Sequence, residues 1–368
     1  MKDFQLRNDT RLLLRHDPRP DLALLTAHKK VLLVYGGTSV KDNGCYADVQ
    51  SAVSQGGGTL CELSGASREL SEVQRGIAQV KEQSIELIIG VGGAQVMDCA
   101  KLIALGCCHE QDLWDFVKMR KDPYGQAKLP LILMPTYPSS GSEYGLGAVC
   151  TDERTGDFGC AYGIAADTAL LVPKYAFTLG RELTAYTGLV TLVQLCAAIL
   201  GDHNPVSYDI GIAVIRRVLE ATRTLQHEPL DEDARGVILY GAALSTSGTL
   251  GLGKEDNYAY EIYELEFIPE VLFKASYRHS LTTIFPRFLL AQSACHAEDV
   301  RRLLTDAFGF EGPVDDSVQR LVDLFAGLGV SMYFEGQASE SAIAQVPVHG
   351  SLDAKQIALL IRSCLKES

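Results

Sequence analysis

The sequence predicts two domains, an α/β domain built on a parallel sheet and an all-helical domain that follows it. In the first half, apolar runs that end in glycine- or serine-rich turns alternate with helical patterns. This alternation is typical of consecutive βαβ units whose sheet is covered on both faces. From about residue 181 onward the apolar pattern is helical only. We therefore expect the α/β domain over 1–180 and the helical domain over 181–368.

Three apolar runs of the first half are expected to be buried strands, at 31–35 (VLLVY), 85–91 (IELIIGV) and 129–134 (LPLILM). A helix is expected over 46–55 after the first run and over 95–105 after the second, because apolar residues recur there at helical spacing. Parallel strands place the turns that follow them at one edge of the sheet, where ligands bind. The three turns are therefore candidate binding elements.

The second half shows apolar residues at i, i+3 and i+4 in eight segments, which predicts helices over 185–200, 207–224, 233–250, 258–266, 277–294, 297–307, 314–328 and 353–366. Breaks are expected at Gly201, Pro229, residues 251–253, Pro269 and Gly309. No internal repeat separates them.

Composition excludes several classes of protein. The 368 residues include 33 basic and 46 acidic side chains, a net charge of −13, which disfavours nucleic acid and anionic membranes as partners. The ten cysteines form no CxxC pair, which favours reduced thiols and the cytoplasm. The N-terminus does not have the pattern of a secretory signal, and no apolar run approaches the roughly 20 residues that cross a bilayer.

The second turn, GVGGAQ at 90–95, lies between a strand and a helix. Main-chain N–H groups of Gly92, Gly93, Ala94 and Gln95, together with the positive end of the helix, could bind a pyrophosphate. Alternatively, the glycines only permit a sharp turn.

Asp98 and Lys101 follow on the first turns of the same helix. Asp98 is a candidate cofactor-binding residue, although a solvated helix face is the more ordinary interpretation of both charges.

The third turn begins at Thr136 and offers the hydroxyls of Ser139, Ser140 and Ser142 at the same edge. They could bind a phosphate or the nicotinamide amide. The alternative is a helix N-terminus that Ser140 or Ser142 caps, with Glu143 opposing the helix dipole.

The first turn contains Gly37, Thr38, Ser39 and Lys41 and lacks an acidic residue that could hold a ribose 2′-hydroxyl. Small hydroxyls and a lysine would accept a 2′-phosphate, so we expect NADP as cofactor, with NAD possible.

Four motifs in this order resemble the iron-containing (group III) alcohol dehydrogenase family: YGGTSVKDNG (35–44), GVGGAQVMDCAK (90–101), LMPTYPSSGSEYGLGAV (133–149) and LGRELTAYTGL (179–189). Within that family the sequence resembles the NADPH-dependent butanol dehydrogenase and aldehyde reductase branch. The resemblance implies a Rossmann-like dinucleotide-binding domain, a helical second domain as in dehydroquinate synthase-like folds, a cleft between them and a homodimer.

The resemblance does not extend to the metal ligands of the family. Its aspartate and first histidine fall on Val190 and Gln194, and two further histidines fall on Tyr263 and Tyr277. A fourth histidine position falls on Phe267. Because these side chains are poor ligands for a divalent ion, we expect no catalytic iron or zinc.

His279 lies two residues from an aligned ligand position and could replace a ligand after a register shift. A surface or helix-terminal histidine is the more ordinary interpretation.

Two functions are consistent with these observations. In the first, NADPH delivers hydride to a small aldehyde or ketone, and Tyr263, Tyr277 or Tyr260 donates a hydrogen bond to the carbonyl in place of the metal. In the second, the chain is a catalytically silent, nucleotide-binding or regulatory relative, and the tyrosines are packing residues. The alcohol or aldehyde would be the small-molecule partner in the first case only.

Overall fold

The computed structural model describes residues 2–201 and 204–366, which form two compact units. One is an α/β unit that takes Arg7–Leu179 and Ala242–Ser247. The other is a helical unit, made of the described residues of Met1–Leu6, Gly180–Gly241 and Gly248–Ser368. Each unit has its own apolar core.

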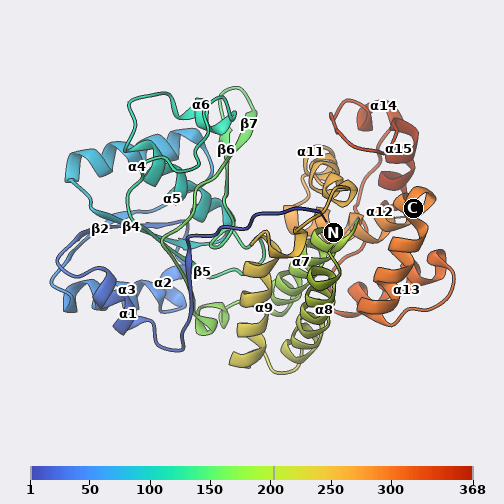
Figure 1. Ribbon diagram of the computed structural model, residues 1–368, viewed down its shortest axis with the longest axis horizontal. Helices are drawn as coiled ribbons and strands as arrows, with labels where there is room; N and C mark the ends of the chain where they lie inside the picture. Colours follow the sequence, from blue (N-terminus) through green and yellow to red (C-terminus); the bar gives the residue numbers. More distant parts are fainter. Residues whose placement is uncertain (1, 202–203, 367–368) are drawn as a thin grey trace. The chain divides into compact units, whose positions relative to one another are not determined.

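Six parallel strands form the sheet of the α/β unit, in the order β1-β8-β5-β4-β2-β3 (Figure 1). Their bounds are β1 Arg11–Leu14, β2 Lys30–Tyr35, β3 Thr59–Leu63, β4 Leu87–Gly92, β5 Leu131–Pro135 and β8 Thr168–Leu171. β4, β5 and β8 are buried along their whole length, and β2 is buried from its second residue on. Such unbroken apolar runs are what a sheet covered on both faces requires.

Helices cover the sheet on both sides. On one face lie α1 (Arg19–Leu25), α2 (Ser39–Asp42) and α3 (Cys45–Gln55), and on the other α4 (Leu70–Gln83) and α5 (Ala94–Gly106) (Figure 1). Because α3 follows β2 on one face and α5 follows β4 on the other, the order of the strands reverses between these neighbours. Ligands of open α/β sheets bind beyond the carboxyl ends of the strands at such a point.

A short helix, α6 (Leu113–Val117), and an antiparallel hairpin of β6 (Gly147–Asp152) and β7 (Asp157–Tyr162) complete the unit, with a 3₁₀ turn at Pro173–Ala176. The hairpin packs on α5. The main-chain N–H and C=O groups of the hairpin therefore lie beside α5.

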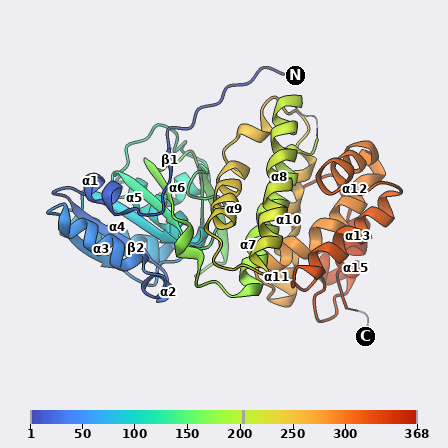
Figure 2. The same ribbon diagram turned by 90° about the horizontal axis from the view of Figure 1, so that it is seen from below.

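The helical unit is organised around α7 (Arg181–Ile199), which is buried from Thr184 to its end. α7 is long and apolar enough to cross a membrane, and nearly all of that stretch is buried within the protein. From the sequence we expected no segment of this length and apolarity; α7 meets both criteria, but its neighbours in the core of the helical unit bury it. The other helices are α8 Pro205–Leu225, α9 Glu232–Ser245, α10 Ile262–Leu265, α11 Phe267–Phe273, α12 Tyr277–Phe308, α13 Val314–Gly327, α14 Glu340–Ile343 and α15 Ala354–Ser363, with 3₁₀ turns at Thr249–Gly251 and Tyr258–Glu261. Figure 2 shows α13 and α15 beside the long helix α12, on which both pack.

The predicted fold class and the three predicted strands are confirmed. The helices predicted over 277–294 and 297–307 are joined in α12, whose helical geometry is interrupted at His296 (φ −124°, ψ 38°). The break expected at Pro269 was wrong, because this proline lies in the first turn of α11, where no helical N–H is needed.

Candidate functional site

Three turns of the α/β unit meet at the carboxyl edge of its sheet. β2 pairs with β4 so that Tyr35 lies beside Val91, and β4 pairs with β5 so that Gly92 lies beside Pro135. The residues that follow these strands are the three predicted cofactor turns. The strand register therefore brings together segments that are far apart in the sequence.

The glycine turn at 92–95 has two glycines with different roles. Gly92 has a φ of +156°, and a Cβ there would lie 3.0 Å from a methyl group of Val96. Gly93 has an ordinary φ of −87°, and its Cβ would meet nothing closer than Tyr137 at 3.9 Å. The need for a sharp turn explains Gly92 but not Gly93.

Open space beside Gly93 lies at the N-terminus of α5, a helix of 13 residues. The first N–H groups of a helix have no partner within the helix, and the helix dipole places positive charge there. Ala94 is half-buried and Gln95 is exposed. The turn can therefore present main-chain N–H groups to a pyrophosphate.

The first turn is open. Gly37, Thr38 and Ser39 are exposed, and a Cβ at Gly37 would meet no atom within 4 Å. Thr38 makes no capping hydrogen bond to α2. These groups are accessible to a ligand.

Lys41 lies beside an acidic residue that sequence reasoning missed. Lys41 Nζ lies 5.8 Å from the ring centre of Tyr35 and 4.9 Å from that of Tyr46. Both phenols donate to Glu62, at 2.7 and 2.5 Å, and these bonds, with a smaller contribution from Lys41, lower the pKa of the Glu62 carboxyl. Glu62 is the penultimate residue of β3, the strand after β2, and an acidic residue near that strand end in a βαβ unit was the available signal.

The serine turn, defined here as residues 136–147, contains no helix. The alternative of a capped helix N-terminus was therefore wrong. Instead, the N–H groups of Tyr144 and Gly145 donate to the carbonyl of Gly141, at 3.0 and 2.9 Å. The main chain turns back on itself because Gly141 adopts a φ of +65°.

The hydroxyls of this turn differ in availability. Ser142 Oγ donates to Asp98 Oδ1 at 2.6 Å, and Ser140 Oγ accepts from the Ser142 N–H at 3.2 Å. The hydroxyls of Thr136 and Ser139 make no hydrogen bond to the part of the chain that the structure describes. These two hydroxyls and the proton of Ser140, which only accepts, are uncommitted, although Thr136 and Ser139 are largely buried.

Three ionisable side chains are buried beneath the serine turn. Asp98 is 7 % exposed and Lys101 is fully buried, so the expectation of a solvated helix face was wrong. Burial raises the pKa of Asp98 and lowers that of Lys101. Burial also raises the pKa of Glu143 to about 7, and Glu143 Oε1 has no partner among the described residues. The strand that covers them, β6, was not predicted.

The predicted catalytic tyrosines lie in the helical unit. Tyr263 is on α10, Tyr277 begins α12, and both are half-buried, whereas Tyr260 is 41 % exposed with its ring 6.0 Å from that of Tyr263. Gln194 Nε2 on α7 donates to Tyr277 Oη at 3.4 Å. Burial raises the pKa of Tyr263 and of Tyr277, so both phenols stay protonated at neutral pH.

The residues at the aligned metal positions do not suit a divalent iron ion. Val190 offers no ligand atom, the Gln194 amide already donates to Tyr277, and the two phenols resist ionisation. Over residues 2–201 and 204–366, no group of three or more His, Cys, Asp or Glu side chains could hold a metal ion. His279 is half-buried against Phe334, with ring centres 4.9 Å apart, and burial lowers its pKa.

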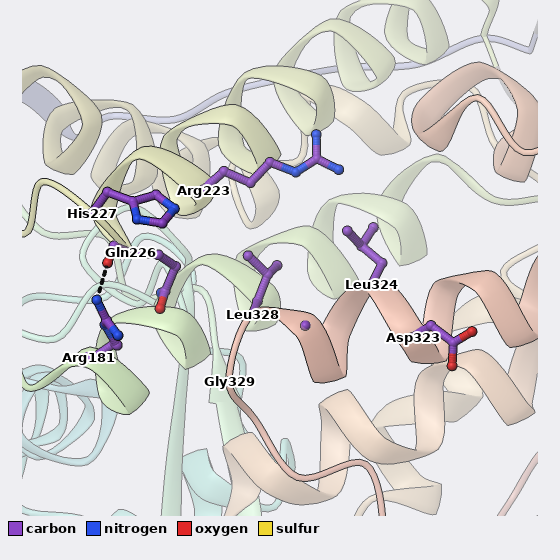
Figure 3. Close-up of a pocket in the computed structure, with 9 residues that line it drawn as sticks. Arg181, Arg223, Gln226, His227, Asp323, Leu324, Leu328 and Gly329 are labelled. Carbon is purple, nitrogen blue, oxygen red and sulfur yellow. Dashed lines mark hydrogen bonds between the residues drawn. The ribbon is translucent and has the colours of Figure 1, made fainter.

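A cavity of about 550 Å³ in the helical unit contains none of the predicted site residues. Figure 3 shows residues that line it, among them the apolar side chains of Leu324 and Leu328 and the cationic side chains of Arg181 and Arg223. Arg181 Nη2 donates to the carbonyl of Gln226 at 2.7 Å, and the Arg223 guanidinium extends away from it. The two cations do not converge on one point.

Comparisons with known proteins place these observations in context. The family model "Iron-containing alcohol dehydrogenase" matches residues 20–178. "Probable NADH-dependent butanol dehydrogenase 1" of Bacillus subtilis is 27 % identical over 332 residues, covering 86 % of this chain and 84 % of the relative. "NADPH-dependent aldehyde reductase YqhD" of Escherichia coli is 26 % identical over 271 residues, covering 70 % of this chain and 68 % of the relative. The solved structure of NADH-dependent butanol dehydrogenase A from Thermotoga maritima has a TM-score of 0.87 at 22 % identity, covering 100 % of this chain and 99 % of that one.

Proposed function

Because the chain belongs to the iron-containing alcohol dehydrogenase family, we propose that it reduces a small aldehyde or ketone with NADPH, without the metal of its relatives. The observation that carries the proposal is the open glycine turn at the N-terminus of α5, at the point where the strand order reverses. A pyrophosphate fits there because main-chain N–H groups are exposed and no Cβ intervenes. NAD would use the same turn.

The α/β unit would hold the cofactor through three turns. Gly92, Gly93, Ala94 and Gln95 would bind the pyrophosphate through main-chain N–H groups. Thr136 and Ser139 would bind a phosphate or the nicotinamide amide, since their hydroxyls are not otherwise used. The bound cofactor supplies the hydride.

The first turn would recognise the adenosine ribose. Gly37, Thr38 and Ser39 leave space for a 2′-phosphate, and Lys41 adds positive charge. Glu62 beside Lys41 adds negative charge and so weakens this preference. NADPH is proposed as the preferred cofactor, with NADH as a weaker alternative.

In the helical unit, Tyr277 is the proposed proton donor. Its Oη accepts a hydrogen bond from Gln194, so its own O–H is free to point at a carbonyl oxygen. Its raised pKa keeps the phenol protonated until negative charge develops on that oxygen. Tyr263 and Tyr260 are the other proposed donors, with Tyr260 the more solvated.

Cofactor binding is tested by titrating the protein with NADPH and following nicotinamide fluorescence, alongside elemental analysis after incubation with iron(II) and zinc(II). Gly93→Asp is expected to abolish binding, because its carboxylate would repel the pyrophosphate, while the fold tolerates it for lack of a close neighbour. Ser54→Asp, which adds the same charge to the exposed side of α3, is the control and should bind normally. Unchanged NADPH affinity in Gly93→Asp would remove the glycine turn from the site.

Catalysis is tested by steady-state reduction of a panel of small aldehydes. Tyr277→Phe is expected to lower kcat by roughly 10²–10⁴-fold while leaving the NADPH dissociation constant unchanged, because a general acid acts only in the transition state. The loss of kcat in Tyr263→Phe and in Tyr260→Phe shows how much each of the other two phenols contributes to catalysis. One bound metal per chain would contradict the metal-free mechanism, and NADPH binding without turnover of any aldehyde would favour the catalytically silent alternative.

The quaternary structure and compartment are proposed from the same family membership. We propose a cytoplasmic homodimer. Light scattering of the purified protein tests the oligomeric state, and a monomeric mass would contradict it.

A further inference from the structure

The ammonium group of Lys101 is buried in the α/β unit and contacts three oxygens. Lys101 Nζ donates to Ser142 Oγ at 3.1 Å and to the carbonyls of Gly145 and Gly147, each at 2.8 Å. An ammonium group has three protons to donate, so its hydrogen-bonding capacity is fully used. The side chain has no exposed surface.

This arrangement is not a direct ion pair. All three acceptors of Lys101 are uncharged, and Asp98 is linked to it only through the hydroxyl of Ser142. Burying a charge is costly, and burial lowers the pKa of Lys101, although the nearby carboxyls of Asp98 and Glu143 act in the opposite direction.

Lys101 organises the second half of the serine turn. Ser142, Gly145 and Gly147 lie in a segment without regular secondary structure or at its junction with β6, and no helix or strand ladder fixes Ser142 and Gly145. Asp98, one helical turn before Lys101 on the same face of α5, accepts from Ser142 Oγ and, at 3.2 Å, from the N–H of Val149. Together the two side chains fix this segment to α5.

The same turn is also held from its other side. Thr246 Oγ1 donates to the carbonyl of Gly141 at 2.8 Å, and a Cβ at Gly141 would lie 2.1 Å from the carbonyl oxygen of Ala242. The serine turn is thus fixed between α5 and residues 242–246. The hydroxyls of Thr136 and Ser139, which are largely buried, take no part in these contacts.

Ser142 is consequently not available to a ligand. Its proton is donated to Asp98 and it accepts from Lys101, so its hydroxyl is committed on both sides. Helix α5 carries this network near its middle and the glycine turn at its N-terminus. One rigid helix therefore fixes the spacing between the glycine turn and the serine turn.

We propose that Lys101 is a positioning residue whose ammonium group acts as a tethered cation, holding the serine turn in the shape that binds the dinucleotide. Asp98 and Ser142 belong to the same network and act through the turn instead of touching the cofactor, which revises their predicted roles as direct ligands. The inference rests on the proposed function, because it presumes that the serine turn binds a dinucleotide.

Lys101→Ala tests the inference by chemical rescue. The substitution removes three methylene groups and the ammonium, which is the size of n-propylammonium. The dissociation constant for NADPH is expected to rise by roughly tenfold or more, as for a lost buried network of charge-assisted hydrogen bonds, and millimolar n-propylammonium should restore most of the affinity. Trimethylammonium has the same charge but a single N–H donor, and it should not rescue. Lys81→Ala on the exposed side of α4 is the matched control.

Lys101→Met separates the charge from the packing of the side-chain stem. This variant keeps an unbranched apolar chain and is the one to use if Lys101→Ala does not fold. The tethered-cation role predicts a weakened affinity in Lys101→Met as well. Wild-type affinity in Lys101→Met, or rescue by trimethylammonium as effective as that by n-propylammonium, would overturn the proposal.

Hydrogen exchange makes the two failures distinguishable. Amides of residues 142–149 should exchange faster in Lys101→Met than in the wild type, whether or not NADPH binds, and amides of β2 should not change. If the wild type does not bind NADPH but Lys101→Met still shows faster exchange, the proposed function and the cofactor role of Lys101 are refuted. The conclusion that Lys101 fixes the serine turn would stand. Unchanged exchange would overturn the inference itself.

Discussion

Glu143 illustrates how burial sets the chemistry of a single residue. It lies 1 % exposed under the serine turn, and burial raises its pKa to about 7 from an ordinary value of 4.5. Between these two pH values the folded chain holds a proton that the unfolded chain releases. The contribution of Glu143 to the free energy of unfolding is therefore largest below pH 4.5 and falls as the pH rises through 7.

Glu143→Gln is expected to remove this dependence on pH. The amide keeps the shape of the side chain but does not ionise. Between pH 5 and pH 8 the wild type should therefore lose roughly 1–3 kcal/mol more of its free energy of unfolding than the Glu143→Gln variant does. Urea denaturation of both proteins at the two pH values measures this. Glu82→Gln on the exposed side of α4 is the control. An equal pH dependence in Glu143→Gln and the wild type would show that Glu143 is already ionised in the folded chain at pH 5.

The glycine turn could be predicted from sequence, but the buried network beneath the serine turn could not. Gly92 and Gly93 follow an apolar run and precede a helical pattern, and both features are local. The burial of Asp98 and Lys101 depends on β6, which lies about 50 residues later and covers their face of α5. A helix pattern alone cannot reveal that a distant strand covers a charged face.

At the scale of elements, α7 and α8 pack closely at Gly188 of α7 and at Gly211 of α8, where a Cβ would lie 2.4 Å from a methyl group of Ile199. A Cβ at Gly188 would lie 1.9 Å from Thr222 Oγ1 and 2.8 Å from its Cγ2. Thr222 is fully buried and its hydroxyl donates to the carbonyl of Val218 at 2.7 Å, so it cannot rotate away without losing this bond. The two helices approach this closely because residue 188 has no side chain.

Gly188→Ala is therefore expected to lower the free energy of unfolding by about 1–3 kcal/mol, because overpacking the α7–α8 contact outweighs the higher helix propensity of alanine. Chemical denaturation measures the change. Gly327→Ala, at the end of α13 with no atom within 4 Å, should cost nothing comparable. A neutral or stabilising Gly188→Ala would mean that the two helices can move apart freely.

The strands that the sequence predicted and those that it missed differ in burial. β2, β4 and β5 are central and buried, so their composition is distinctive. β1 and β3 are the edge strands, with only one buried residue each, and β8 is a four-residue strand. The hairpin strands β6 and β7 lie outside the main sheet and mix polar with apolar residues. Short or one-sided burial leaves too weak a pattern to separate a strand from a loop.

At the scale of the whole molecule, the chain passes between the two units more than once. Residues 2–6 precede the α/β unit but cluster with the helical unit, and Ala242–Ser247 lie late in the chain but belong to the α/β unit. The sequence indicated a single change of pattern near residue 180, because residues 242–247 continue the apolar pattern of α9 without a break. Their assignment depends on the contacts of Gly141 with Ala242 and Thr246, which only the folded chain reveals.

The α/β unit is therefore not encoded by one continuous stretch of the sequence. A gene fragment that ends at residue 180 would encode all six strands of the main sheet but would lack the hydroxyl of Thr246, which anchors the serine turn. A chimera that exchanges this half with that of a relative must carry residues 242–247 along with residues 7–179. Recombination at a single point near residue 180 would instead separate the serine turn from one of its two supports.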